Sequence, residues 1–135
     1  MTKPSVINLL KNASQPWVRY NTLRFILNKP FDTHGCKHAY RETIKHPLIQ
    51  SVIKKSLQWP NPPLKSHKTA SHPMHLIGLL ADLGIVLPYK PIARIVNNII
   101  RHQDSRGAFQ SLLVLPSIWG GSNQPDWLWM FCDAP

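Results

Sequence analysis

The strongest constraint on the fold is the segment of residues 91–109, in which a long amphipathic stretch runs directly into a polar turn. Its aliphatic residues recur with the 3.6-residue period of a helix: Ile92, Ile95, Val96, Ile99 and Ile100. The period ends before the turn at residues 103–109, which contains Gly107. A helix with one apolar face must bury that face against a neighbour. The segment therefore predicts a helix that belongs to a helical hairpin.

The partner helix is predicted immediately upstream. Ser71 can cap its start, and Pro73 suits its first turn. Its apolar stripe consists of Leu76, Leu79, Leu80 and Leu83. Gly84 then suits the left-handed conformation that ends many helices. We expect the two helices to pair antiparallel, with both stripes in one buried seam.

Three further helices are predicted over residues 5–11, 16–27 and 35–57. The third is interrupted at Pro47, because proline lacks a backbone donor and clashes with the preceding turn. Residues 58–70 begin with a proline-rich stretch and read as an extended connector. The predicted fold class is all-α: antiparallel helical hairpins form a single helical-repeat domain over residues 1–135, and the connector is the candidate for an internal boundary.

The C-terminal part has a weaker pattern. Residues 110–118 are apolar without a clear helical period, and residues 119–125 read as a loop. Asp126 can cap a last helix that begins at Trp127. An aromatic helix at the end of the chain needs a neighbour. We therefore expect the chain to be a fragment of a longer array or to self-associate through this helix.

Charge and composition limit the partners and the location. The 135 residues include sixteen Lys and Arg against six Asp and Glu. The basic residues occur singly apart from Lys54 and Lys55, which favours a solvated basic surface and argues against nucleic acid as a partner. The N-terminus does not resemble a signal peptide, and no apolar stretch reaches the roughly 18 residues of a spanning helix. We expect a cytoplasmic protein without a transmembrane segment.

The turn at residues 103–109 resembles the repeat turn of the terpenoid cyclase and protein prenyltransferase superfamily, in which a helix ends at a Gln, a Gly and an aromatic residue. Gln103, Gly107 and Phe109 occupy these places. Arg106 stands where a second Gly or Asp is common, and Phe109 where Trp is typical. The resemblance covers about residues 71–131. It implies an incomplete α/α-toroid and a structural role for the three turn residues.

The resemblance also implies a cavity for an apolar or isoprenoid ligand, but it transfers no catalytic residue. Cyclases of the superfamily protonate their substrate with closely spaced aspartates, whereas the six acidic residues here are scattered. Of the Asp, Cys and His that hold zinc in prenyltransferases, only the adjacent pair Cys132 and Asp133 is present. Cys36 does not form a nucleophile and base pair with His34 or His38, because residues two apart do not face each other on a helix. We predict neither catalytic residues nor a cofactor.

The candidates for a metal site are His67, His72 and His75. If a helix starts near Pro73, His72 and His75 lie one turn apart, and His67 can reach them from the connector. No carboxylate or thiol lies nearby in the sequence to complete the set. The alternative is that these imidazoles are solvated or bonded to the backbone.

Two functional classes remain open. In the first, the chain is a toroid-like segment, without catalysis of its own, that holds an apolar or isoprenoid ligand. In the second, it is a scaffold of the HEAT type, with residues 16–27 as its first helix, whose basic outer face binds an acidic protein or nucleic acid. Both rest on analogy at the level of the fold.

Overall fold

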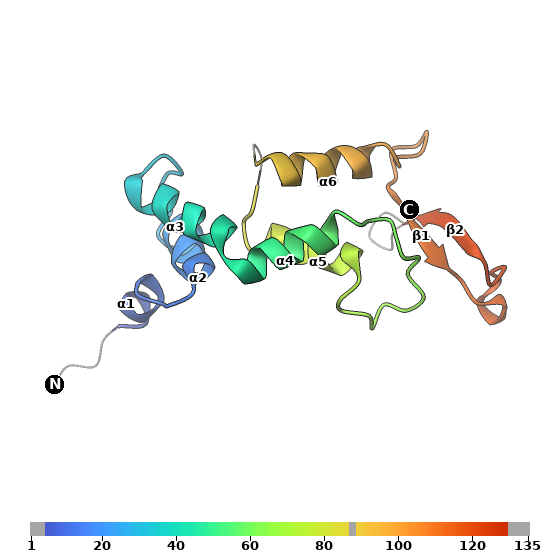
Figure 1. Cartoon of the computed structure of the whole chain (residues 1–135), viewed down its shortest axis with the longest axis horizontal. Helices are drawn as coiled ribbons and strands as arrows, with labels where there is room; N and C mark the ends of the chain where they lie inside the picture. Colours follow the sequence, from blue (N-terminus) through green and yellow to red (C-terminus); the bar gives the residue numbers. More distant parts are fainter. Residues whose placement is uncertain (1–4, 87–88, 130–135) are drawn as a thin grey trace. The chain divides into compact units, whose positions relative to one another are not determined.

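The computed structural model describes residues 5–86 and 89–129 (Figure 1). Most of this part is helical, and a two-stranded antiparallel hairpin follows the last helix. The elements in chain order are α1 (Val6–Lys11), α2 (Pro16–Asn21), the π-helix η1 (Thr22–Ile26), α3 (His34–Lys45), α4 (Pro47–Ser56), α5 (Pro73–Asp82), α6 (Lys90–Ile100), β1 (Gln110–Val114), the 3-10 helix η2 (Ser117–Trp119) and β2 (Pro125–Trp129). None of the helices in these ranges is long and apolar enough to cross a membrane.

The chain divides into two compact units. Unit 1 consists of Met1–Ser51 and Leu80–Ile85, and unit 2 consists of Val52–Leu79 and Val86–Pro135. Helices α4 and α5 each contribute to both units. Each unit is therefore built from segments that are distant in the sequence.

Unit 1 is centred on the pair α2 and α3. Its core contains Tyr20 from α2 and Ala39 and Tyr40 from α3, with Leu23 and Ile44 packed against them. Because the buried residues on α3 recur every three or four positions, they lie on one face of the helix. The sequence-based expectation of an antiparallel helical hairpin is thus met most clearly here.

The predicted helix boundaries in the first half of the chain are close to those observed. The break at Pro47 is confirmed, since α3 ends at Lys45 and α4 begins at Pro47. The helix predicted over residues 16–27 changes from α to π geometry at Thr22, whose hydroxyl donates to the Val18 carbonyl at 2.7 Å. This wider turn was not anticipated from the sequence.

The end of α5 confirms the role predicted for Gly84. Its φ angle is 70°, in the region that favours glycine. The Gly84 amide donates to the Ala81 carbonyl at 2.9 Å, and the Ile85 amide donates to the Leu80 carbonyl at 3.0 Å. These two bonds form a Schellman motif. The motif folds the buried Ile85 back toward the helix.

The burial of α5 and α6 does not bear out the single seam expected between them. Leu80, Ile92 and Ile95 are buried, whereas Leu79 is 42% and Ile100 is 52% exposed. The prediction that all nine aliphatic residues share one seam is therefore wrong. The reason is that the buried residues serve two different cores, since Leu80 belongs to unit 1 and Ile92 and Ile95 belong to unit 2.

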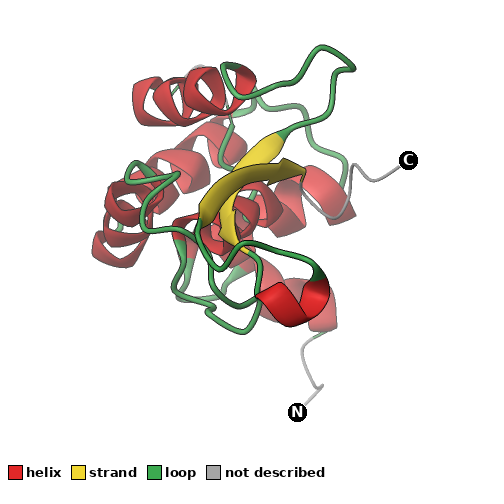
Figure 2. Ribbon diagram, turned by 90° about the vertical axis from the view of Figure 1, so that its right-hand side faces the viewer, coloured by secondary structure: helices red, strands yellow, loops and turns green. Residues whose placement is uncertain are grey.

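The prediction of a purely all-α fold is also wrong, because β1 and β2 pair antiparallel, with Gln110 opposite Trp129 and Val114 opposite Pro125. The expected helix beginning at Trp127 is instead strand β2, which Figure 2 shows as one arm of a twisted hairpin. Residues two apart share one face of a strand but not of a helix. The alternation Trp127-Leu128-Trp129 therefore suits the observed strand.

The proline-rich connector is non-helical, as predicted, but turns make up much of it, and a short stretch around Leu64 pairs with the hairpin. The Leu64 amide donates to the Leu112 carbonyl, and the Val114 amide donates to the Leu64 carbonyl, both at 2.9 Å. Leu64 thus runs parallel to β1 on the edge opposite β2. Close by, the buried indole Nε1 of Trp59 donates to Ser111 Oγ at 3.2 Å. The connector is therefore part of the core of unit 2.

Candidate functional site

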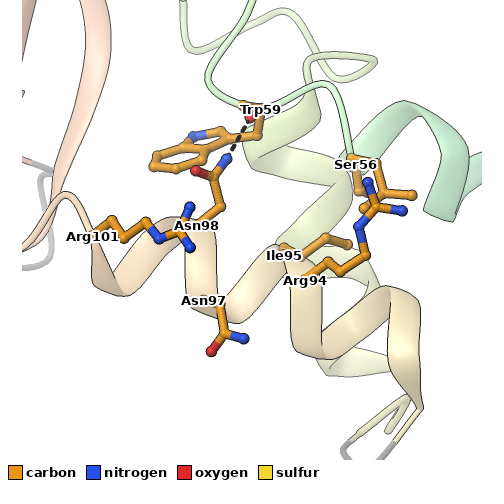
Figure 3. A pocket seen from close by; sticks show the side chains of 8 residues that line it. Ser56, Trp59, Arg94, Ile95, Asn97, Asn98 and Arg101 are labelled. Atoms are coloured by element: carbon orange, nitrogen blue, oxygen red, sulfur yellow. Dashed lines mark hydrogen bonds between the residues drawn. The ribbon is translucent and has the colours of Figure 1, made fainter.

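The candidate site lies on the polar face of α6. Arg94, Asn97, Asn98 and Arg101 are spaced i, i+3, i+4 and i+7, so they form one stripe along the helix. The apolar residues of α6 occupy the other side and include the buried Ile92 and Ile95. The stripe lines a pocket of about 320 Å³ within unit 2 (Figure 3).

The other wall of this α6 pocket comes from the end of α4 and the start of the connector. It consists of Ser56, Leu57 and Trp59, and Ile95 of α6 completes the lining. Asn98 fixes α6 to this wall through its hydrogen bond to the Trp59 carbonyl, which Figure 3 shows as a dashed line. The Trp59 indole is in turn held by Ser111. The shape of the pocket therefore depends on contacts of the connector with both α6 and β1.

The α6 pocket combines apolar side chains with the guanidinium groups of Arg94 and Arg101. Among the described residues, neither Arg94 nor Arg101 forms an ion pair with a carboxylate. The Ser56 hydroxyl, also in the lining, is fully buried and has no hydrogen-bond partner in the described part of the chain. Two guanidinium groups without carboxylate partners suit an anion with several oxygen acceptors. The pocket is thus a better match for phosphate or carboxylate than for a hydrocarbon.

The three histidines proposed as metal ligands do not form a metal site. His72 is buried, with Nε2 at 2.6 Å from the Pro62 carbonyl and Nδ1 accepting from the Met74 amide at 3.2 Å. Both ring nitrogens of His72 are therefore engaged by the backbone. His67 is exposed. In the ranges that the structure describes, no group of three His, Cys, Asp or Glu side chains could hold a metal ion.

Of the two cysteines considered above, only Cys36 lies among the described residues, and its thiol is buried. Cys36 is buried in α3, and its Sγ lies 4.0 Å from the Lys29 carbonyl. His34 and His38 stack on each other along the exposed side of α3, with ring centroids 6.2 Å apart. Cys132 and Asp133 lie outside the described residues.

The turn at residues 103–109 has part of the geometry that the family resemblance implies. Gly107 has a φ of 88°, and Gln103 Nε2 donates to the Gly107 carbonyl at 2.6 Å. Gln103 also pairs with Phe109 as an isolated antiparallel bridge. The resemblance also implies that Gln103 is at least partly buried at the helix end, and this expectation is wrong, because Gln103 is exposed. Its partner is the backbone of its own turn, which needs no neighbouring repeat.

Asp104 holds this turn together, and sequence reasoning missed it. Its Oδ1 accepts from the Arg106 amide at 2.8 Å and the Ala108 amide at 3.0 Å, and its Oδ2 accepts from the Trp129 indole at 2.8 Å. The Arg106 guanidinium lies 3.8 Å from the centre of the Trp129 ring. An Asp followed by Ser-Arg-Gly is a common turn signal and could have identified this residue.

The same contacts shift the ionisation of Asp104. Loss of solvent would by itself raise the pKa of this carboxyl. The hydrogen bonds from the two amides and the indole, with the charge of Arg106, outweigh that effect and lower the pKa below its ordinary value of 3.8. The ionised form of Asp104 is therefore favoured by folding.

We expect the substitution Asp104→Asn to destabilise the protein in a pH-dependent way. The contribution of ionised Asp104 is fully present above the unfolded-state pKa, and it is lost as the pH falls through the lowered folded-state pKa. Urea unfolding of both proteins between about pH 7 and about pH 2 measures the difference. That difference should shrink toward low pH, and a difference that stays constant over the range would contradict the assignment.

Comparison with known proteins gives no relative for this chain. No protein family, characterised protein or solved structure matches it significantly. The resemblance to the terpenoid cyclase and prenyltransferase superfamily stays a prediction that rests on the turn and the adjoining helices. Function is therefore argued from the α6 pocket itself.

Proposed function

We propose that the chain is a basic binding module and that the polar stripe of α6 contacts the phosphate backbone of a nucleic acid. The observation that carries this proposal is the α6 pocket, in which two exposed arginines without ion pairs among the described residues flank the exposed Asn97. Arg and Asn are side chains that commonly bond phosphate oxygens. Their role here is to hold a backbone and not to carry out a reaction.

The spacing of the two arginines favours a repeating anion over a single small one. Seven residues of helix separate Arg94 from Arg101 by about 10 Å, a length that covers roughly three phosphates of one strand of duplex DNA. A lone phosphate can be bound by a single guanidinium, whereas two arginines at this spacing can contact neighbouring phosphates of one strand. The stripe therefore supports a polyanion as the partner.

The charge around the pocket supports the same partner. The described residues of unit 2 include eight Lys and Arg against two Asp. One of these aspartates, Asp104, is already engaged by its own turn. The basic residues are scattered along the sequence, which is why the sequence alone argued against nucleic acid. The helical period brings Arg94 and Arg101 together on one face.

The apolar or isoprenoid ligand implied by the family resemblance is the weaker proposal. Its cavity would have to be lined mainly by apolar side chains. The α6 pocket instead has four polar residues on its helical wall, and Trp59 is buried in the opposite wall. A toroid would also continue with helices after the turn at residues 103–109, where this chain forms β1.

The proposal is tested by the salt dependence of binding to a fluorescein-labelled DNA duplex of about 20 base pairs, followed by anisotropy between about 50 and about 200 mM salt. The logarithm of the association constant should fall linearly with the logarithm of the salt concentration. In the double variant Arg94→Gln, Arg101→Gln, we expect the affinity to fall at least about tenfold and the slope to decrease by about 1.8, because two phosphate contacts are lost.

The matched control is the double variant Lys37→Gln, Lys45→Gln. It removes the same charge from exposed positions on α3 in unit 1, and the slope should stay close to that of the parent. Equal slopes for the two double variants would show that only net charge matters and would refute the α6 site. Binding of an acidic peptide such as poly-glutamate, without binding of the duplex, would identify an acidic protein as the partner instead.

A further inference from the structure

The tip of the β-hairpin presents two large apolar side chains to solvent. Ile118 is 81% and Trp119 is 73% exposed. Both belong to η2, in the loop that joins β1 to β2. This hairpin tip, Leu115–Asn123, is not part of the α6 pocket. Exposed apolar residues at the end of a projecting loop are typical of a contact with another surface.

The backbone of the hairpin tip is closed by its own hydrogen bonds. The Trp119 and Gly121 amides both donate to the Pro116 carbonyl, at 2.9 and 3.1 Å, and the Ser117 amide donates to Asn123 Oδ1 at 2.9 Å. A Cβ atom on Gly121 would lie 2.0 Å from the Leu115 carbonyl oxygen, so the two sides of the loop are in close contact. The loop therefore has a defined conformation in which its apolar residues point outward.

Basic residues lie on the chain that leaves the sheet beside β1. Leu64 pairs in parallel with β1 at Leu113, so the chain that follows it, residues 65–70, leaves the sheet in the direction of the tip. The exposed residues of this loop include Lys65, His67 and Lys68. One carboxylate, Asp126 at the start of β2, opposes them in charge.

We propose that the hairpin tip docks the protein onto an anionic lipid bilayer. Ile118 and Trp119 enter the interfacial region, where the amphipathic ring of Trp is preferentially found. Lys65 and Lys68 remain at the level of the headgroups and attract their negative charge.

The shape of the hairpin tip favours a bilayer over a protein partner. The tip holds two strongly exposed large side chains, Ile118 and Trp119, beside Leu115, which is 38% exposed, and a protein partner would have to supply a matching pocket for them. A bilayer accepts a protruding apolar pair without a preformed cavity, and the adjacent lysines provide the affinity for anionic lipids. The α6 stripe takes no part in this docking, so the inference does not depend on the proposed function.

The test is co-sedimentation with sucrose-loaded vesicles of phosphatidylcholine, with and without about 30% phosphatidylserine. We expect the parent protein to bind the serine-containing vesicles more tightly. The double variant Ile118→Ser, Trp119→Ser should lose at least about tenfold in partition coefficient. The double variant Lys65→Gln, Lys68→Gln should lose about fivefold per lysine on anionic vesicles only.

Two matched controls make this test specific. The double variant Val6→Ser, Leu9→Ser removes exposed apolar residues from α1 and should bind vesicles like the parent. The α6 variant Arg94→Gln, Arg101→Gln should keep its vesicle binding, while Ile118→Ser, Trp119→Ser keeps its DNA binding. The two proposals can therefore fail separately.

Two results would overturn the docking proposal. The first is vesicle binding that is absent in the parent or equal in the parent and the Ile118→Ser, Trp119→Ser variant. The second comes from light scattering: a dimeric parent that becomes monomeric in this variant would show that a second copy of the chain covers the hairpin tip.

Discussion

Replacing Trp59 by alanine is expected to lower the free energy of unfolding by about 3–5 kcal/mol. Trp59 is 3% exposed, and its ring contacts those of His102 and Trp127 at centroid distances of 5.4 and 6.0 Å. The substitution removes this large buried side chain. It also leaves the fully buried Ser111 hydroxyl without its indole donor. Equilibrium unfolding in urea measures the loss.

Trp119→Ala is the matched control for this prediction. The same side chain is removed from the exposed hairpin tip, so the free energy of unfolding should change by less than about 0.5 kcal/mol. Equal destabilisation of the two variants would contradict the burial of Trp59 in the core of unit 2. Comparing them thus separates the effect of burying a tryptophan from the effect of the residue type itself.

Replacing Gly84 by valine is expected to destabilise the protein by about 2–5 kcal/mol, because two separate penalties apply. The φ of 70° is strained for any residue with a side chain, and more so for a β-branched one. In addition, the new Cβ would lie 3.0 Å from Tyr20 Cε1 and 3.2 Å from both Asn21 Oδ1 and Phe25 Cε2. Urea unfolding again gives the magnitude.

Gly78→Ala, within α5, should have the opposite sign. A Cβ at Gly78 meets no atom within 4 Å, and its backbone is helical. Alanine there is expected to stabilise the protein by up to about 1 kcal/mol through helix propensity. A loss of stability in Gly78→Ala would contradict the uncrowded helical position of Gly78. A neutral Gly84→Val would contradict the observed end of α5.

The elements that could be predicted from the sequence are those specified by local signals. Proline fixed the start of α4, and Gly84 fixed the end of α5, because both residues act on the backbone of their own segment. The apolar period of α6 was equally clear. What this period does not specify is the surface that α6 covers, and for this reason the exposure of Leu79 and Ile100 was not foreseen.

The hairpin was missed because a strand depends on partners that are distant in the sequence. Trp127 and Trp129 were assigned to a helix on the strength of a capping aspartate, although their spacing of two suits a strand. The pairing of β1 with Leu64 is not detectable from either segment alone. Tertiary pairing therefore outweighed the local capping signal.

In the candidate site too, the part that depends on local sequence was predictable and the part that depends on distant segments was not. The stripe of Arg94, Asn97, Asn98 and Arg101 follows from helical geometry, so it could have been predicted as the face opposite the apolar period. The other wall, with Ser56 and Trp59, comes from a segment far upstream. His67, His72 and His75 are candidates for metal ligands by residue type, yet His72 bonds the backbone of the connector.

The contact between Trp59 and Ser111 also bears on how unit 2 folds. These residues are 52 positions apart in the sequence, so their contact closes a long loop that contains α5 and α6. Closing such a loop has an entropic cost that is repaid only when the distant partners are in place. We therefore expect the connector and the β-hairpin to acquire their structure together and after the local helices. During synthesis, while β1 is still inside the ribosome, the Trp59 indole of the nascent chain lacks its acceptor, Ser111.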